Sequence, residues 1–196
     1  MSADDEGELI DYRTWGVEFF HRAVTEERVV RGVNVLSGRV IDVGPMGVGP
    51  GRLVKVTAKG QIGTATGQRV GDEPVSFHVT LPVPIELTID LGVDKHRFNA
   101  DIGVPLKIAA RARGDLAIVL EITPPTAAQV QVQLQAQGLR AQMVQLATGV
   151  EGELKRFIAK YVKLELSKPY LLEATTIDVA GAIDRASRSV GPKASP

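Results

Sequence analysis

The chain has 196 residues, no cysteine, and 23 basic against 23 acidic residues, so its formal net charge is zero. The absence of cysteine excludes disulfides and thiolate chemistry. A neutral balance gives no bulk attraction to nucleic acid, and no apolar run approaches the roughly 20 residues of a membrane-spanning helix. A mass of 21.0 kDa suits one domain. We expect it to cover residues 9–188, between a disordered acidic segment (1–8) and a disordered tail (189–196).

The first predicted element is an amphipathic helix from Leu9 to Glu26. Its polar side carries residues such as Glu18 and Arg22, and the opposite side is apolar and aromatic. We expect the apolar side to cover part of a sheet. Its members are Trp15, Phe19, Phe20, Ala23 and Val24.

Two strands are predicted next, from Val33 to Val43 with a bulge at Gly38, and from Val54 to Ile62. The segment Gly44–Gly51 between them is rich in glycine and proline. It lacks the Gly-Lys-Ser/Thr ending of a phosphate-binding loop and leads into a strand rather than a helix. We therefore interpret it as a hairpin loop at a rim.

The most regular pattern is the segment Val75–Val93, in which every odd-numbered residue is apolar and every even-numbered residue is polar, proline or glycine. This alternation predicts a strand with one buried face. At about 3.3 Å per residue it would extend roughly 60 Å if straight. A compact domain of this length has a diameter of roughly 40 Å. The domain is therefore predicted to be elongated, or the strand strongly curved.

A second alternating segment, His96–Ala112, follows a predicted turn at Asp94 and Lys95. Pairing Val93 with His96 would match Leu91 with Phe98 and Leu81 with Ile108, so that apolar partners share a face. The same register places Pro84 opposite Pro105, with Pro82 nearby. Because proline has no N–H to donate, it is confined to edges, bulges and bends. We predict a bend midway along this hairpin.

Strands from Leu116 to Ile122 and from Ala128 to Ala136 complete a predicted meander of six strands. In the last of these, glutamines alternate with apolar residues, which is typical of a solvated outer face. A long amphipathic helix is then predicted from Leu139 to Leu166, weakened at Gly149 and Gly152. A final strand is predicted from Tyr170 to Val179.

The predicted fold is therefore α+β: a long, strongly curved antiparallel β-meander wrapped around a long amphipathic C-terminal helix, with an N-terminal helix. It resembles the tubular lipid-binding (TULIP) superfamily, which includes bactericidal/permeability-increasing proteins and bacterial relatives in actinobacteria. The resemblance is carried by the strands Val75–Val93 and His96–Ala112, the helix Val150–Leu166 and the strand Thr176–Val179. It implies that the chain binds lipid in a hydrophobic cavity between sheet and helix.

Independently of the resemblance, the inner faces of the long strands and of the helix are expected to form a trough of apolar side chains without charge. We name these residues the trough residues. A lipid in the trough would be selected loosely, at its rim; the alternative is an ordinary core packed to native density. The trough residues are Phe77, Val79, Leu81, Ile85, Leu87, Phe98, Ile102, Leu106, Ile108, Ile118, Leu120, Val132, Met143, Leu146, Val150, Leu154 and Phe157.

A basic stripe lies on the opposite side of the predicted C-terminal helix. Arg156, Lys160 and Lys163 follow a spacing of four and then three residues, so they share one face. One interpretation is contact with an anionic membrane surface. The other is an ordinary solvated helix face.

No catalytic or metal-binding motif is present. His21, His78 and His96 have no hydroxyl or carboxylate partner at motif spacing. We therefore expect a protein that is not an enzyme and needs no cofactor or metal. It would carry a lipid or other apolar ligand, contact an anionic membrane transiently, bind no nucleic acid, and be located in the cytoplasm at the membrane periphery. Two alternatives stay open: a non-catalytic interaction or scaffold module with a filled core, and an enzyme whose polar residue is unidentified.

Overall fold

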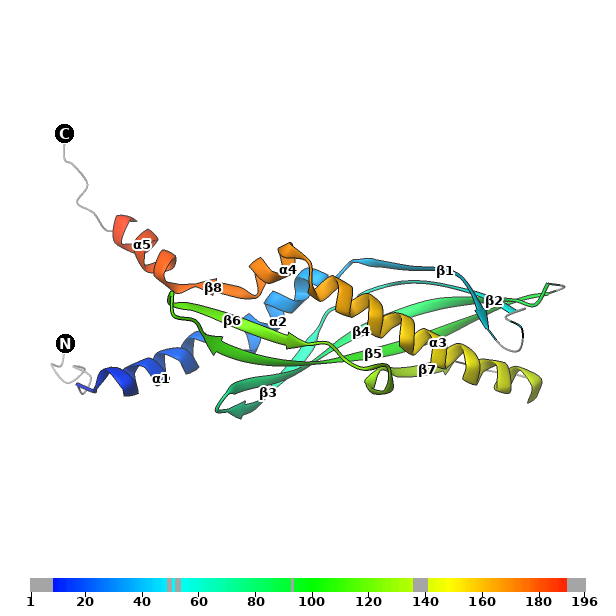
Figure 1. Cartoon of the computed structure of the whole chain (residues 1–196), viewed down its shortest axis with the longest axis horizontal. Helices are drawn as coiled ribbons and strands as arrows, with labels where there is room; N and C mark the ends of the chain where they lie inside the picture. Colours follow the sequence, from blue (N-terminus) through cyan, green and yellow to red (C-terminus); the bar gives the residue numbers. More distant parts are fainter. Residues whose placement is uncertain (1–8, 49–50, 52–53, 93, 136–140, 190–196) are drawn as a thin grey trace, which may run out of the picture.

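The computed structural model describes residues 9–48, 51, 54–92, 94–135 and 141–189, with the backbone alone at 141–148. Of the segments predicted to be disordered, 1–8 and 189–196, all residues except Ser189 lie outside the described residues, and Ser189 is the last residue of a helix. The fold is α+β, as predicted: a strongly curled antiparallel sheet forms a half-barrel, and the described residues include five α-helices. Figure 1 shows an elongated molecule whose long axis follows the central strands.

The central hairpin consists of β4 (Val75–Asp90) and β5 (Lys95–Ala112). Its register pairs Leu87 with Phe98 and Leu81 with Val104, which is four residues away from the predicted register. The predicted two-residue turn is wrong, because the loop takes four residues, Leu91–Asp94, closed by a 2.9 Å hydrogen bond from Leu91 N–H to the Asp94 carbonyl. A shift by an even number of residues keeps every side chain on its predicted face.

The three prolines of the hairpin lie where the neighbouring strands are interrupted. β4 pairs with β2 (Val54–Gln61) along one part and with β3 (Thr66–Asp72) along another, and Pro82 and Pro84 fall in the gap. On the other side, β5 pairs with β7 (Gln131–Gln135) and β6 (Ala117–Thr123), with Pro105 in the gap. Pro105 is opposite Thr80 rather than Pro84. These gaps divide the sheet into two halves.

The first half has the strand order β1-β2-β4-β5-β7, with β1 spanning Val40–Val48. The helix α3 (Ala141–Leu166) contacts both of its edge strands, β1 and β7. Four side chains of α3 at spacings of four residues join the hydrophobic core: Val150, Leu154, Ile158 and Val162. Burial of this stripe explains why the helix remains continuous through Gly149 and Gly152, the two positions where it was predicted to be weakened.

The second half has the order β3-β4-β5-β6-β8, with β8 spanning Thr176–Asp178. Two short helices contact each other here: α2 (Glu26–Val33) and α4 (Pro169–Ala174). Their close approach requires Gly32, since a Cβ there would lie 3.2 Å from the Ala174 carbonyl oxygen. Leu171 of α4 and Val33 of α2 are both buried in the same core.

Several predicted boundaries are wrong near the chain ends. The first predicted helix is two helices, α1 (Tyr12–Ala23) and α2, because the Thr25 side chain accepts a hydrogen bond from Arg28 N–H and begins a new helix. The strand predicted from Val33 begins only at Val40, after a 3₁₀ turn (Asn34–Leu36), and continues to Val48 through much of the predicted loop.

Three further corrections concern irregular backbone and missed elements. Gly38, predicted as a bulge, has φ 81° and lies in the turn before β1; the bulge of β1 is between Val43 and Met46. The strand β3 was not predicted. The first half of the predicted last strand belongs to α4, only Thr176–Asp178 is a strand (β8), and β8 is followed by another helix, α5 (Val179–Ser189). No helix among the described residues is long and apolar enough to cross a membrane.

Candidate functional site

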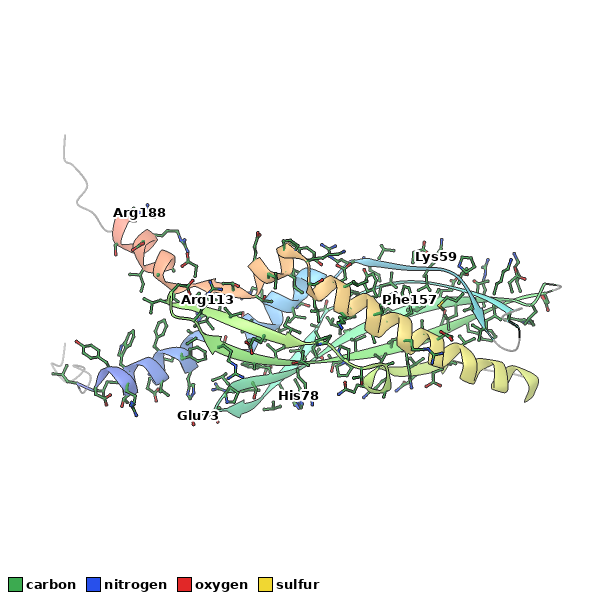
Figure 2. The ribbon with its side chains drawn as sticks, viewed as in Figure 1. Lys59, Glu73, His78, Arg113, Phe157 and Arg188 are labelled. Atoms are coloured by element: carbon green, nitrogen blue, oxygen red, sulfur yellow. The ribbon has the colours of Figure 1, made fainter. Side chains whose placement is uncertain are left out.

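The trough residues of the strands lie on the inner face of the sheet, as the alternation predicts. Ten of them are at most 4% exposed, as are Val150 and Leu154 of α3. Phe98, Val132 and Phe157 are half-buried against the same core, and Figure 2 shows Phe157 on α3. Met143 and Leu146 fall in the part of α3 whose side chains are not described. The ten strand residues are Phe77, Val79, Leu81, Ile85, Leu87, Ile102, Leu106, Ile108, Ile118 and Leu120.

Around the twelve buried residues the trough is filled by protein side chains. A side chain that is at most 4% exposed touches protein atoms over nearly all of its surface. No space for an acyl chain therefore lies against these residues. A ligand would enter the trough only if α3 moved away from β1 and β7, the strands that it contacts.

An open groove lies elsewhere, at the end of the molecule where α1 and α5 project (Figure 1). Its volume is about 850 Å³, within the range of small-molecule sites. Apolar side chains form most of its lining. Among the described residues that line it, three are arginines and none is an aspartate or glutamate. The lining is Phe19, Arg22, Ala23, Arg28, Arg31, Gly32, Val35, Ala174, Ile177, Val179, Ala182, Ile183 and Ala186.

The three arginines are held differently. The Arg28 Nη1 donates to the carbonyls of Ala23 at 2.8 Å and Arg22 at 3.4 Å, so it covers the C-terminal end of α1. Arg31 pairs with Glu27 on the outer surface of α2, at 2.6 Å. Arg22 is exposed in the last turn of α1. Together they give the groove a positive rim.

The helix α1 contributes to this groove and packs against the core only near its C-terminal end, through Phe20 and Ala23. All of its residues are described and none is buried. Its start is fixed locally, because the Asp11 carboxylate accepts hydrogen bonds from Thr14 and from Arg13 N–H. The pKa of Asp11 lies below its ordinary value, and the hydrogen bonds from Thr14 are the main cause. The prediction that this apolar side covers the sheet is right only for its C-terminal part, where Val24 is buried in the core and Phe20 and Ala23 pack against it. Trp15 instead stacks on Phe19 at 5.2 Å, and Phe19 lines the groove.

The basic stripe of α3 is exposed, as predicted, but carboxylates on the same helix form ion pairs with Arg156 and with the neighbouring Lys155. Arg156, Lys160 and Lys163 all face outward, away from the buried side of the helix. Arg156 pairs with Glu153 at 2.6 Å, and the adjacent Lys155 pairs with Glu151 at 2.6 Å. The net charge of this surface is therefore smaller than the basic residues alone indicate.

A buried carboxylate that was not predicted joins α3, α4 and the start of β1. The Glu165 side chain is 6% exposed and pairs with Lys168, accepts a 2.7 Å hydrogen bond from Tyr170, and lies 3.7 Å from Arg39. The Arg39 guanidinium lies 4.1 Å from the centre of the Tyr170 ring. We call these four residues the Glu165 cluster. No spacing rule would bring Arg39 to them, because that contact depends on the tertiary fold.

Electrostatics in the cluster follow from these contacts. Burial acts to raise the pKa of Glu165, but the bonds from Lys168 and Tyr170 and the charge of Arg39 outweigh it and lower the pKa. Burial and the bond to Glu165 raise the pKa of Tyr170 to about 12. The cluster therefore holds Glu165 ionised and Tyr170 protonated at neutral pH.

The geometry shows a binding groove more clearly than a reaction centre. No group of three or more metal-ligating side chains occurs in the part of the chain that the structure describes. His96 lies 3.2 Å from Asp94 at the exposed tip of the hairpin, outside the groove. Of the elements that form the groove, α5 has the clearest sequence signal: Val179, Ala182, Ile183 and Ala186 follow helical spacing. Comparison of the chain with protein-family models and with curated proteins gives no match.

Proposed function

We propose that this protein, without catalysing a reaction, binds a lipid or another ligand with an apolar tail and carries it to or from a membrane surface. The observation that carries the proposal is the groove between α1, α2, β8 and α5, which combines apolar walls with a purely basic charged lining. The apolar walls suit a hydrocarbon tail, and the arginines suit an anionic head. No cofactor or metal is required.

The magnitudes favour an anionic amphiphile over a neutral hydrocarbon. Burying a methylene contributes about 0.8 kcal/mol, so a sixteen-carbon tail with half of its surface covered in an open groove gains roughly 6 kcal/mol. Association and ordering cost several kcal/mol. A hydrogen bond to a charged group contributes about 1.5–3 kcal/mol. Since tail burial and the cost of association nearly balance, the contact of an anionic head with Arg22 or Arg28 decides whether net binding is favourable. Selectivity would come from the head group at the groove's rim.

The trough between sheet and α3 is a second location for the same ligand. Its support is the uncharged inner face and the position of α3 across both edge strands, consistent with a sheet that wraps around the helix. Entry there requires α3 to move, whereas the groove at the α1–α5 end is already open. The groove is therefore the site that we propose for the conformation described.

Native mass spectrometry of protein purified from its own host tests the proposal, followed by uptake of a fluorescent fatty acid by the delipidated chain. Ala182→Trp fills the groove and is expected to reduce uptake at least tenfold. Ser187→Trp, on the same helix but outside the lining, is the matched control and is expected to bind normally. If neither bound lipid nor uptake is found, the proposal is wrong; if uptake persists in Ala182→Trp, the groove is not the site.

An interaction or scaffold module is the second candidate, favoured by the filled interior and by the exposed aromatic face of α1. Such a module would need no lipid. It predicts a lipid-free purified protein whose thermal stability is unchanged by fatty acids or phospholipids. The lipid proposal predicts stabilisation that grows with ligand concentration.

A further inference from the structure

Exposed apolar side chains are concentrated at the end of the molecule where α1 and α5 project. Tyr12 and Trp15 of α1 are 96% and 56% exposed, and Ile183 of α5 is 56% exposed. Leu116, in the turn between β5 and β6, is 64% exposed. Figure 1 shows the two helices diverging from the body so that the space between them opens away from the sheet. We call this surface the helical end.

The exposed residues of the helical end are not required for the fold. None of the residues of α1 is buried, although the helix carries a tyrosine, a tryptophan and two phenylalanines. A helix of this length is marginal in water without packing. The apolar side of α5 faces the groove together with Phe19 and Ala23 of α1. Tyr12 lies on another side of α1, above a second, shallower hollow. A partner that buries the exposed apolar residues of both helices would stabilise both helices.

Charge and residue type identify the partner. The charged groups lining the groove are Arg22, Arg28 and Arg31. Glu27 offsets the charge of Arg31, so Arg22 and Arg28 are the groups that attract an anionic partner. A second copy in a closed twofold dimer would bring these arginines against their own counterparts, which is unfavourable. Tyrosine and tryptophan have an apolar body and a polar edge and concentrate at the membrane–water interface. Amphipathic helices with apolar and basic residues lie in that interface.

We infer that the helical end docks on an anionic lipid surface, with the apolar sides of α1 and α5 in the headgroup region and the arginines against lipid phosphates. The inference rests on the proposed function, because it places the lipid-binding groove directly against the source of its ligand. It differs from the interpretation of the α3 stripe, in which Arg156 is paired with Glu153 and the neighbouring Lys155 with Glu151. A fluid surface also accommodates two diverging helices that a rigid partner would have to match.

Trp15 makes the test direct, because it is the only tryptophan of the chain. With vesicles containing equal parts of phosphatidylcholine and phosphatidylglycerol, we expect its emission to shift to shorter wavelength and the protein to float with the vesicles. Phosphatidylcholine alone, or high salt, is expected to abolish both effects. An unchanged emission with anionic vesicles would overturn the inference.

Variants separate the helical end from the α3 stripe. Arg22→Gln is expected to lower the vesicle partition coefficient about fivefold, and Tyr12→Ser about tenfold. Tyr12 lies on a helix without buried residues, so its replacement leaves the core intact. Lys160→Gln on α3 is the matched control and is expected to leave partition unchanged. If Lys160→Gln lowers partition and Arg22→Gln does not, the stripe is the docking surface and the inference is wrong.

Two further measurements distinguish membrane docking from self-association and from lipid uptake. Light scattering of the wild type and of Tyr12→Ser is expected to show one oligomeric state for both proteins. A wild-type dimer that Tyr12→Ser dissociates would make the helical end a self-association surface and overturn the inference. Fatty-acid uptake without vesicles tests the proposed function separately, so protein that takes up lipid but never floats refutes docking alone. Protein that floats but takes up no lipid refutes the carrier alone.

Discussion

Replacing Glu165 by glutamine tests whether the buried carboxylate holds α3, α4 and β1 together. The substitution keeps the shape of the side chain and removes its charge, while Lys168, Tyr170 and Arg39 remain around it. Hydrogen bonds to a charged group contribute about 1.5–3 kcal/mol, against about 1 kcal/mol for a neutral pair. Lys168 and Arg39 are partly exposed, so solvent screens part of the difference. We expect a loss of about 2 kcal/mol in the free energy of unfolding.

The difference in stability between wild type and Glu165→Gln should also depend on pH in a defined direction. Because the folded-state pKa of Glu165 is lowered from its ordinary value of 4.5, its contribution is fully present above that value and is lost as the pH falls through the folded pKa. Urea unfolding of wild type and Glu165→Gln should therefore differ at neutral pH and converge in acid. Equal stability at neutral pH, or a difference that stays constant below pH 4.5, would refute the assigned role of the charge.

Three other predictions concern the Glu165 cluster, the close contact between Gly60 of β2 and Pro84 of β4, and the hydrophobic core. Tyr170→Phe should remove a stabilisation that in wild type is complete below the ordinary pKa near 10 and is lost as the pH rises through about 12; alkaline unfolding followed by circular dichroism measures it. Gly60→Ala should cost about 1–3 kcal/mol, because its Cβ would lie 2.4 Å from the Pro84 carbonyl oxygen. Gly16→Ala, in open space on α1, is its control in urea unfolding and should not destabilise. Leu154→Ala should cost about 2–5 kcal/mol; retention of wild-type stability would contradict the packed interior.

Regular patterns could be predicted from the sequence where one periodicity extends over many residues. The alternation in β4 and β5, and the three- and four-residue spacing in α3, identified these elements and their buried faces. The register of the hairpin was missed, because it depends on a four-residue loop in which Gly92 adopts φ 85°. The segment of α4 was predicted as a strand, since a short apolar segment such as Tyr170–Leu172 fits either structure.

The groove was not predicted, because it is formed by elements that the sequence did not separate or place. α2 was merged with α1, and α5 was not predicted, so the convergence of Phe19, Arg28 and Ile183 was not visible. The trough residues of the strands, by contrast, were correctly placed on one inner face, but alternation does not distinguish a face that lines a cavity from one that fills a core. Side-chain burial provides that distinction.

The proline gaps have a consequence for how the molecule opens. Near Pro82 and Pro84, only Gly63 N–H bonds to β4 from its outer side, at the Pro82 carbonyl, and the sheet continues between its halves through β4 and β5 alone. Cooperative unfolding units tend to follow such breaks in hydrogen-bonded structure. Amide hydrogen exchange should then reveal two groups of protected strands, β1, β2 and β7 in one and β3, β6 and β8 in the other. One end of the protein would be free to fluctuate while the other keeps its native structure.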